Sequence, residues 1–122
     1  IIATNTTITR DHLTTDEKRV AACGAGGLSG GPLKQKSTRM ITDLFSLTKG
    51  KVPIVGVGGI FTAEDAWEKI AAGASLVQLY TGFIYRGPGI VREINHGLER
   101  ILKREGFANL DAAVGCRAHE RS

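Results

Sequence analysis

The chain is 122 residues long, carries a formal net charge of +4 and is 42% hydrophobic, with 16 glycines. This composition is typical of a globular α/β chain, and no apolar run approaches the roughly 18 residues that a membrane span needs. The basic residues are scattered and are not interleaved with aromatic residues, which argues against a nucleic-acid-binding protein. Cys23 and Cys116 form neither a disulfide framework nor a metal-ligand spacing, and the three histidines show no ligand spacing either, so we predict no metal site.

The first half of the chain predicts two strands, one long loop and one helix. A strand at residues 1–3 runs into a hydroxyl-rich segment, and residues 8–36 then form a polar, glycine-rich loop that is long enough to indicate a function. Ser37 is expected to cap a helix that continues to Thr48 and carries apolar residues at helical spacing. A second strand follows at residues 52–57.

The second half predicts three helices and one strand. The first helix is expected to begin with Thr62 as its N-cap, and Asp65 partly completes a capping box. The remaining elements are a strand at residues 75–80, a long amphipathic helix after Pro88 that ends at Gly106, and a short helix at residues 109–114. The charged tail after Gly115 is expected to fray.

The apolar runs at the predicted strands are continuous, which is typical of parallel strands that are buried on both faces. Two of these strands end in small residues, at Gly58-Gly59 and at Thr81-Gly82, where backbone N–H groups stay uncovered and a phosphate can approach closely. Paired strand ends of this kind match the phosphate site of a (β/α)8 barrel, and a whole barrel needs about 250 residues. We therefore expect an α/β fold in which residues 1–122 are the C-terminal part of a single (β/α)8 TIM-barrel domain, roughly its last three βα units.

The first strand ends in Thr4-Asn5-Thr6-Thr7. Side chains at the C-terminal ends of barrel strands form the active-site face. The amide of Asn5 offers donors and an acceptor, which suits recognition of an imide or amide edge of a polar heterocycle. A local turn, in which Asn and Thr bond their own backbone, explains the same residues equally well.

A glycine-rich stretch at residues 26–33 is the second candidate site, because such a loop can wrap a ligand with backbone amides and Ser29 adds a hydroxyl. Its G-x-S-x-G pattern does not indicate a hydrolase, since a nucleophile elbow needs a strand directly before it. The glycines after residue 55 do not indicate a Rossmann domain, because Phe61 replaces the third glycine and no acidic residue ends the following strand.

Taken together, the motifs resemble the dihydroorotate dehydrogenases, and most closely their quinone-dependent, class 2 branch. The resemblance rests on four segments in register, at residues 4–7, 26–33, 53–59 and 76–83, and the segments 82–88 and 106–115 strengthen it. It covers nearly the whole chain. The implied enzyme oxidises dihydroorotate to orotate in pyrimidine (UMP) biosynthesis, with FMN as cofactor and a quinone as electron acceptor.

The resemblance also implies roles for individual residues. Asn5 and Thr6 are expected to hold the pyrimidine substrate. The expected cofactor-binding residues are Thr4, Ser29, Gly30, Val57, Gly58, Gly59, Tyr80 and Thr81. The resemblance implies that the FMN phosphate is received by Gly58, Gly59, Tyr80 and Thr81. Thr4, Ser29 and Gly30 are expected to contact the flavin.

Several parts of the family are expected upstream of this chain: the general base, a lysine near the flavin, further substrate-binding asparagines and the membrane-seeking helices. We thus expect no catalytic residue here, an inactive isolated segment, membrane contact only through the missing region, and the rest of the barrel as a partner. The implied location is the mitochondrial inner membrane in a eukaryote, or the cytoplasmic face of the membrane in a bacterium.

Residues 13–25 and 116–119 depart from the family pattern. Two alternatives remain: another FMN barrel oxidoreductase, or a non-catalytic flavin-binding fragment.

Overall fold

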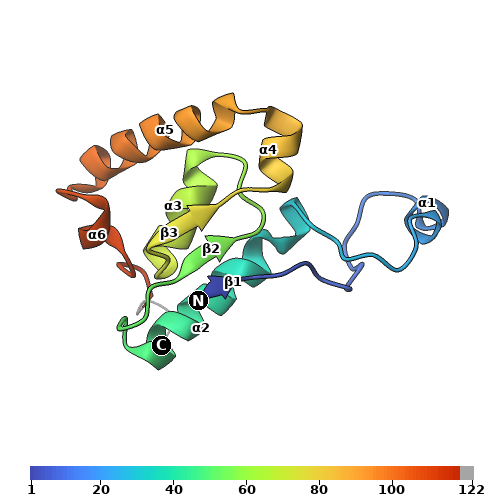
Figure 1. The fold of residues 1–122 in the computed structure, drawn as a ribbon, viewed down its shortest axis with the longest axis horizontal. Coiled ribbons are helices and arrows are strands. Elements are labelled where there is room, and N and C mark those ends of the chain that lie inside the picture. The colour runs from blue at the N-terminus through green and yellow to red at the C-terminus, as the bar shows by residue number, and fades with distance from the viewer. Residues whose placement is uncertain (119–122) are drawn as a thin grey trace.

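The computed structural model describes residues 1–118, and its centre is a three-stranded parallel sheet with helices packed on one face (Figure 1). The elements are β1 (Ile2–Ala3), α1 (Glu17–Ala22), the 3-10 helix η1 (Gly31–Leu33), α2 (Lys34–Thr48), β2 (Val55–Val57), α3 (Ala63–Ala72), β3 (Leu76–Gln78), α4 (Thr81–Arg86), α5 (Gly89–Glu105) and α6 (Leu110–Ala113). The strand order is β1-β2-β3, with Ile2 opposite Val55 and Gly56 opposite Val77. The predicted βα organisation is therefore confirmed, although β2 and β3 are shorter than expected.

Helix α2 begins four residues earlier than the sequence predicted, and its N-cap is Leu33 instead of Ser37. The helix starts at Lys34 directly after η1, whose first turn holds Pro32. Ser37 is fully buried in the first turn, and its hydroxyl donates a 2.5 Å hydrogen bond to the carbonyl oxygen of Val57. Ser37 thus joins α2 to the end of β2 instead of terminating a helix.

Residues 8–36 are not a loop throughout. They contain α1, which Asp16 caps by accepting a hydrogen bond from the Lys18 N–H, and η1. Figure 1 shows α1 at the far end of an extended excursion, away from the sheet. The short helix α4 was also missed, because the sequence placed residues 75–80 in a strand and assigned no element to residues 81–86.

The tail after Gly115 was expected to fray, and for residues 116–118 this was wrong. The N–H groups of Gly115 and Arg117 donate to the carbonyl oxygens of Ile70 and Ala71 at 3.0 and 2.9 Å. Ala118 is buried. This segment therefore closes the C-terminal end of α3, while the rest of the tail lies outside the described residues.

Helix α3 is the centre of the hydrophobic core. Its capping box is complete, since Thr62 Oγ1 accepts from the Asp65 N–H and Asp65 Oδ2 accepts from the Thr62 N–H. One side of α3 packs on α5, where Gly97 lets that helix approach Ala63 closely. The main core consists of buried residues from α3, α5, α6 and the turn after β2: Ile60, Ala63, Ala66, Trp67, Ile70, Ala71, Ile90, Ile94, Leu98, Ile101 and Ala113.

The face of the sheet opposite the helices is open in the described structure. Ile2 of β1 is 68% exposed and Leu76 of β3 is 63% exposed. The expectation that the strands are buried on both faces is therefore wrong for this chain taken alone. Three strands form a sheet with two edges and cannot curl back to cover their own inner face.

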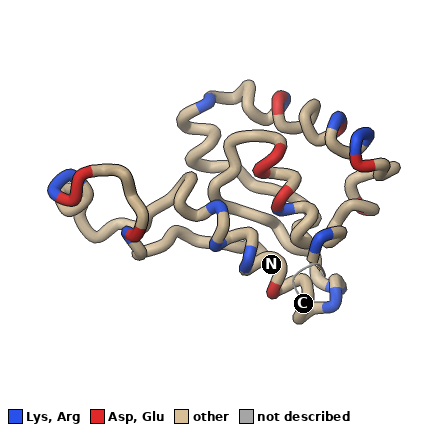
Figure 2. The backbone as a smooth tube through the Cα atoms, turned by 180° about the vertical axis from the view of Figure 1, so that it is seen from behind, with Lys and Arg blue, Asp and Glu red and all other residues tan. Residues whose placement is uncertain are grey.

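Charged residues do not gather on one side of the described chain. Figure 2 shows Lys and Arg on separate parts of the backbone, with Asp and Glu among them. None of the helices in residues 1–118 combines the length and the apolar content that crossing a bilayer requires.

Expressed alone, residues 1–122 should self-associate, because β1 and β3 present unpaired outer edges beside an apolar face. We expect light scattering after size exclusion to give masses well above that of a monomer. Leu76→Lys should reduce this association, since a charge on the open face opposes stacking. Leu47→Lys, at an 80% exposed position on the outer side of α2, should leave it unchanged. A monodisperse wild-type monomer would contradict this prediction.

Candidate functional site

A cavity of about 420 Å³ lies where the three strands end, and it collects every site residue that the sequence predicted. Ten predicted residues line it: Thr4, Asn5, Thr6, Ser29, Gly30, Val57, Gly58, Gly59, Tyr80 and Thr81. They come from three strand ends and from the glycine-rich loop. The parallel sheet brings them together because its strands all end at one edge.

The cavity also has lining residues that the sequence analysis did not name: Ile2, Leu33, Ile60, Gln78, Leu79 and Gly82. Gln78 is the notable one, because it is an exposed polar side chain in an otherwise apolar strand. The two-residue period of a strand puts Gln78 on the same face as Leu76 and Tyr80. That period was the signal in the sequence that could have identified it.

The turn after β2 is built from two glycines with left-handed backbone angles. Gly58 has φ +111° and Gly59 has φ +70°, a region that side chains disfavour. A Cβ on Gly59 would lie 2.6 Å from the Cα of Lys34, and one on Gly58 would lie 3.2 Å from the Cβ of Leu33. The turn therefore rests directly on the start of α2, and only glycine fits there.

The N–H groups of this turn are available to a ligand. Among the described residues, neither Gly58 nor Gly59 donates a backbone hydrogen bond. Consecutive free N–H groups in a turn with left-handed angles form a concave site that favours anions.

The glycine-rich loop is fastened to the third strand end. Thr81 Oγ1 at the start of α4 donates a 2.8 Å hydrogen bond to Ser29 Oγ. Gly30, with φ +82°, lies so close that a Cβ there would be 3.0 Å from the Cγ2 of Thr81. Ser29 and Gly30 consequently form one wall of the cavity beside Thr81.

The first strand end contributes two different polar groups. Thr4 Oγ1 is buried and has no hydrogen-bond partner among residues 1–118. Asn5 Oδ1 accepts from the adjacent Thr6 N–H at 2.7 Å, so a local bond of Asn to the backbone is present, although residues 4–6 form no turn. This bond occupies one acceptor position of the Asn5 side chain, whose N–H donors make no hydrogen bond within residues 1–118.

A second tether joins this strand end to the loop. Thr7 and Leu28 form an isolated antiparallel bridge with hydrogen bonds of 3.0 and 2.7 Å in the two directions. Thr6 packs on Gly27 so closely that any side chain at position 27 would collide with it. The two sequence segments singled out for the site therefore support each other.

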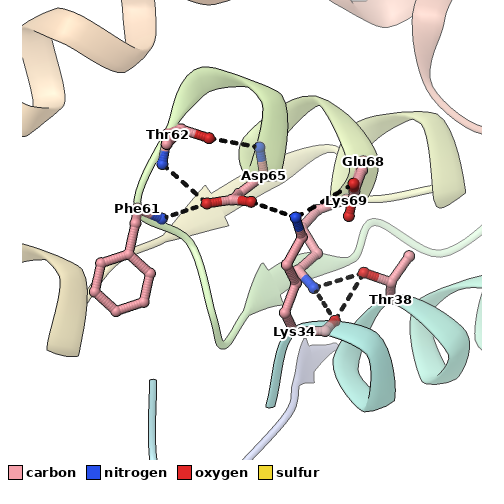
Figure 3. Close-up of polar contacts among 7 residues, drawn as sticks. All are labelled: Lys34, Thr38, Phe61, Thr62, Asp65, Glu68 and Lys69. Atoms are coloured by element: carbon pink, nitrogen blue, oxygen red, sulfur yellow. Dashed lines mark hydrogen bonds and ion pairs between the residues drawn. The ribbon is translucent and has the colours of Figure 1, made fainter. Parts of the chain in front are cut away.

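Behind the glycine turn, a group of charged residues joins α2 to α3 (Figure 3). Lys34 Nζ lies 2.6 Å from Asp65 Oδ1 and 3.3 Å from Glu68 Oε1. Asp65 Oδ2 accepts from the N–H of Phe61 at 2.9 Å and from that of Thr62 at 3.0 Å. The sequence analysis identified Asp65 only as part of a cap and missed its partner Lys34.

These contacts shift the pKa values of both partners. The hydrogen bond to Asp65 raises the pKa of Lys34 in spite of partial burial. Burial alone would raise the pKa of Asp65, but the bonds from Lys34 and from the backbone N–H groups outweigh it and lower the pKa. Asp65 therefore stays ionised at neutral pH.

Lys69 of α3 is fully buried, and its Nζ donates to the carbonyl oxygen of Lys34 and to Thr38 Oγ1, each at 2.6 Å. Burial lowers the pKa of Lys69 from 10.5 to about 8. No group of His, Cys, Asp and Glu side chains in the described part of the chain is arranged to hold a metal ion.

Comparison with known proteins decides the family. A family model of dihydroorotate dehydrogenase matches residues 1–102. The chain belongs to the dihydroorotate dehydrogenase family. The family assignment made from the sequence motifs is thereby confirmed.

Curated relatives carry the name dihydroorotate dehydrogenase (quinone). The protein of Trichodesmium erythraeum is 55% identical over 121 residues, covering 94% of this chain and 32% of the relative. That of Gloeobacter violaceus is 54% identical over 116 residues, covering 95% of this chain and 31% of the relative. The chain thus spans about a third of the length of the relatives it matches.

Solved structures of the family confirm the fold class. The dihydroorotate dehydrogenase of Eimeria tenella in complex with ferulenol is 42% identical and superposes with a TM-score of 0.87, covering 97% of this chain and 31% of that one. Its ligand-free form is 43% identical, with a TM-score of 0.86. The chain therefore has the α/β structure of one part of a dihydroorotate dehydrogenase barrel.

Tests that need a closed barrel use this chain joined to the part of the Trichodesmium erythraeum dihydroorotate dehydrogenase that it does not match, which we call the full-length protein. In that protein, Lys69 should make stability rise with pH. The unfolded state keeps the Lys69 proton up to pH 10.5, while the folded state releases it near pH 8. The unfolded state then binds more protons between these values, so the free energy of unfolding increases with pH there.

The measurement is urea unfolding of wild type and Lys69→Met between about pH 7 and pH 10. The stability of wild type relative to Lys69→Met should grow by up to about 3 kcal/mol over this range. Lys51→Met removes an exposed lysine, and the difference in the free energy of unfolding between wild type and this control should not increase with pH. A constant or falling difference for Lys69→Met would show that the folded state does not lower the pKa of this lysine.

Proposed function

We propose that this chain is the C-terminal third of an FMN-dependent dihydroorotate dehydrogenase that oxidises dihydroorotate to orotate in pyrimidine (UMP) biosynthesis and uses a quinone as electron acceptor. The observation that carries the proposal is the convergence of all ten predicted residues on one cavity at the strand ends. The name shared by the curated relatives gives the reaction and the acceptor class.

The residues of the cavity fit FMN. The Gly58-Gly59 turn offers unpaired N–H groups in a concave turn, which suits the phosphate, and Tyr80 and Thr81 border it. Thr4 Oγ1 is a buried hydroxyl without a partner among residues 1–118, which is the expected state of a group that bonds a ligand. Ser29, Gly30 and Val57 complete the wall, and a Cβ at position 30 would narrow the gap to Thr81.

Asn5 and Thr6 are the proposed substrate contacts. Bound FMN would supply the acceptor for the hydride that dihydroorotate loses and the route of its electrons to the quinone. The bond from the Thr6 N–H holds Asn5 Oδ1, so the N–H donors of the Asn5 amide remain for the substrate. A carbonyl of the pyrimidine ring is a matching acceptor. No general base is proposed among these residues, so this step needs the upstream part of the protein.

The open face of the sheet indicates a further partner, the upstream part of the same protein. We propose that residues 1–122 belong to one TIM-barrel domain and that the upstream part of the protein covers Ile2 and Leu76, which are exposed here. Membrane contact belongs to that upstream part as well. The protein would then act at the mitochondrial inner membrane in a eukaryote or at the cytoplasmic face of the membrane in a bacterium.

The function is tested by mixing the full-length protein with dihydroorotate without oxygen and recording the bleaching of the bound flavin. We expect bleaching with dihydroorotate and recovery on addition of a quinone. Flavin binding without bleaching would favour a non-catalytic flavin protein, and bleaching by a different substrate would favour another FMN barrel.

Gly59→Asp in the full-length protein should abolish FMN binding, because it puts a negative charge and a side chain where the phosphate is proposed to lie. Gly59→Ala separates the two effects, since its methyl group meets the Lys34 backbone without adding charge. Gly106→Asp is the matched control, a glycine with φ +79° and open space around it at the end of α5. The flavin-to-protein ratio should fall most for Gly59→Asp, and a full complement of FMN in that variant would overturn the phosphate position.

Asn5→Ala should slow flavin reduction by dihydroorotate and leave flavin content unchanged. A lost hydrogen bond in a closed site costs about 1–3 kcal/mol, which corresponds to roughly one to two powers of ten in rate. Asn109→Ala, which removes the cap of α6 far from the cavity, serves as the control. An unchanged bleaching rate, or loss of flavin in step with activity, would contradict the role of Asn5.

A further inference from the structure

Lys34 and Asp65 hold the glycine turn from both sides, although neither lines the cavity. The backbone of Lys34 is the surface against which Gly59 packs, since a Cβ there would lie 2.6 Å from the Cα of Lys34. On the other side, the Asp65 carboxylate accepts from the N–H groups of Phe61 and Thr62, which follow the turn. The side chains of Lys34 and Asp65 then meet at 2.6 Å.

The turn is therefore part of a closed ring of contacts, and Figure 3 shows the polar contacts of that ring. The ring runs from the Lys34 backbone to Gly59, along the chain to Phe61 and Thr62, through the Asp65 carboxylate, and back to Lys34 by the ion pair. The Asp65 side chain is only 11% exposed and that of Lys34 is 34% exposed, so water screens this pair less than a surface pair. Lys69 adds a further tie, because its Nζ bonds the Lys34 carbonyl oxygen.

Lys34 does not serve as a direct phosphate ligand in this arrangement. Its ammonium group is already bonded to Asp65 and lies near Glu68, so its charge is neutralised on the far side of the turn. Its influence on a ligand has to pass through the backbone that it positions.

We propose that Lys34 and Asp65 are positioning residues for phosphate recognition: their ion pair keeps the Gly58-Gly59 turn in the conformation whose N–H groups receive the phosphate of the flavin nucleotide. The inference rests on the proposed function, because it takes the bound group to be FMN. It makes a specific claim about ligands, namely that breaking the pair weakens binding of the phosphate and not binding of the ring.

The test compares FMN with riboflavin, which carries the same ring system without the phosphate. Both are titrated into flavin-free full-length protein, and binding is followed by quenching of flavin fluorescence. Asp65→Asn keeps an oxygen that can accept from Phe61 and Thr62 and removes the charge that bonds Lys34. Lys34→Met breaks the same pair from the other side and leaves the capping box untouched.

Both variants should lose about 10-fold to 100-fold in FMN affinity, while riboflavin affinity changes by less than about 3-fold. Lys34→Arg, which keeps the charge, should bind FMN nearly as wild type does. The double variant should lose little more than either single variant, because the two residues act as one unit. Glu99→Gln is the control, since it breaks the exposed Lys103–Glu99 pair on α5 and should change neither affinity.

Each outcome decides the proposal. Unchanged FMN affinity in the variants, or equal losses for FMN and riboflavin, overturns the positioning role and indicates a general structural one. If Asp65→Asn fails to fold, Lys34→Met carries the same comparison. Failure of the proposed function is recognised separately in wild type: either no flavin binds, or FMN binds no better than riboflavin.

Discussion

The close approach of the Gly58-Gly59 turn to the start of α2 is the constraint on which the rest of this site depends. The Gly59 backbone lies against Lys34, the first residue of α2, so the start of this helix lies beside the turn that follows β2. The 3-10 helix η1 then leads the chain back from Gly30 and brings Ser29 to the cavity wall beside Thr81. Ser37 completes the junction through its bond to Val57. One contact between two backbones thus sets the position of the glycine-rich loop.

Helices cover only one face of the sheet, and this explains why apolar residues on its other face are exposed. Helices α2 and α3 bury one side of the strands, whereas Ile2, Leu76 and Tyr80 stay exposed on the other. The same open face carries Gln78, a cavity-lining residue. Under the function proposed here, the residues that close the barrel and the residues that close the cavity come from the same missing part of the protein.

Lys34 and Lys69, which lie close together between α2 and α3, have different kinds of hydrogen-bond partner. Lys34 forms ion pairs with the carboxylates of Asp65 and Glu68, and the hydrogen bond to Asp65 is the main cause of its raised pKa. Lys69 is left with a carbonyl and a hydroxyl, both from α2, and burial lowers its pKa to about 8. The arrangement joins α2 to α3 beside the glycine turn.

Local sequence signals determined much of this protein. The order of the three strands and of the longer helices and the capping of α3 by Thr62 could be predicted, because capping and periodicity act over a few residues. The meeting of the strand ends at one edge followed from the parallel sheet, whereas the full set of ten cavity residues came from the resemblance to the dihydroorotate dehydrogenases. Short helices were missed, since α1 and α4 have no apolar periodicity long enough to recognise.

Only the tertiary structure decided what several polar side chains do. A serine at a helix start can cap the helix or bond a distant backbone, and the nearness of the Val57 carbonyl made Ser37 do the second. The burial of Lys69 and its pairing with groups on α2 depend on residues more than thirty positions away. The ion pair of Lys34 with Asp65 is of the same kind, because the two side chains meet only where α2 packs on α3, and no local pattern specifies that packing.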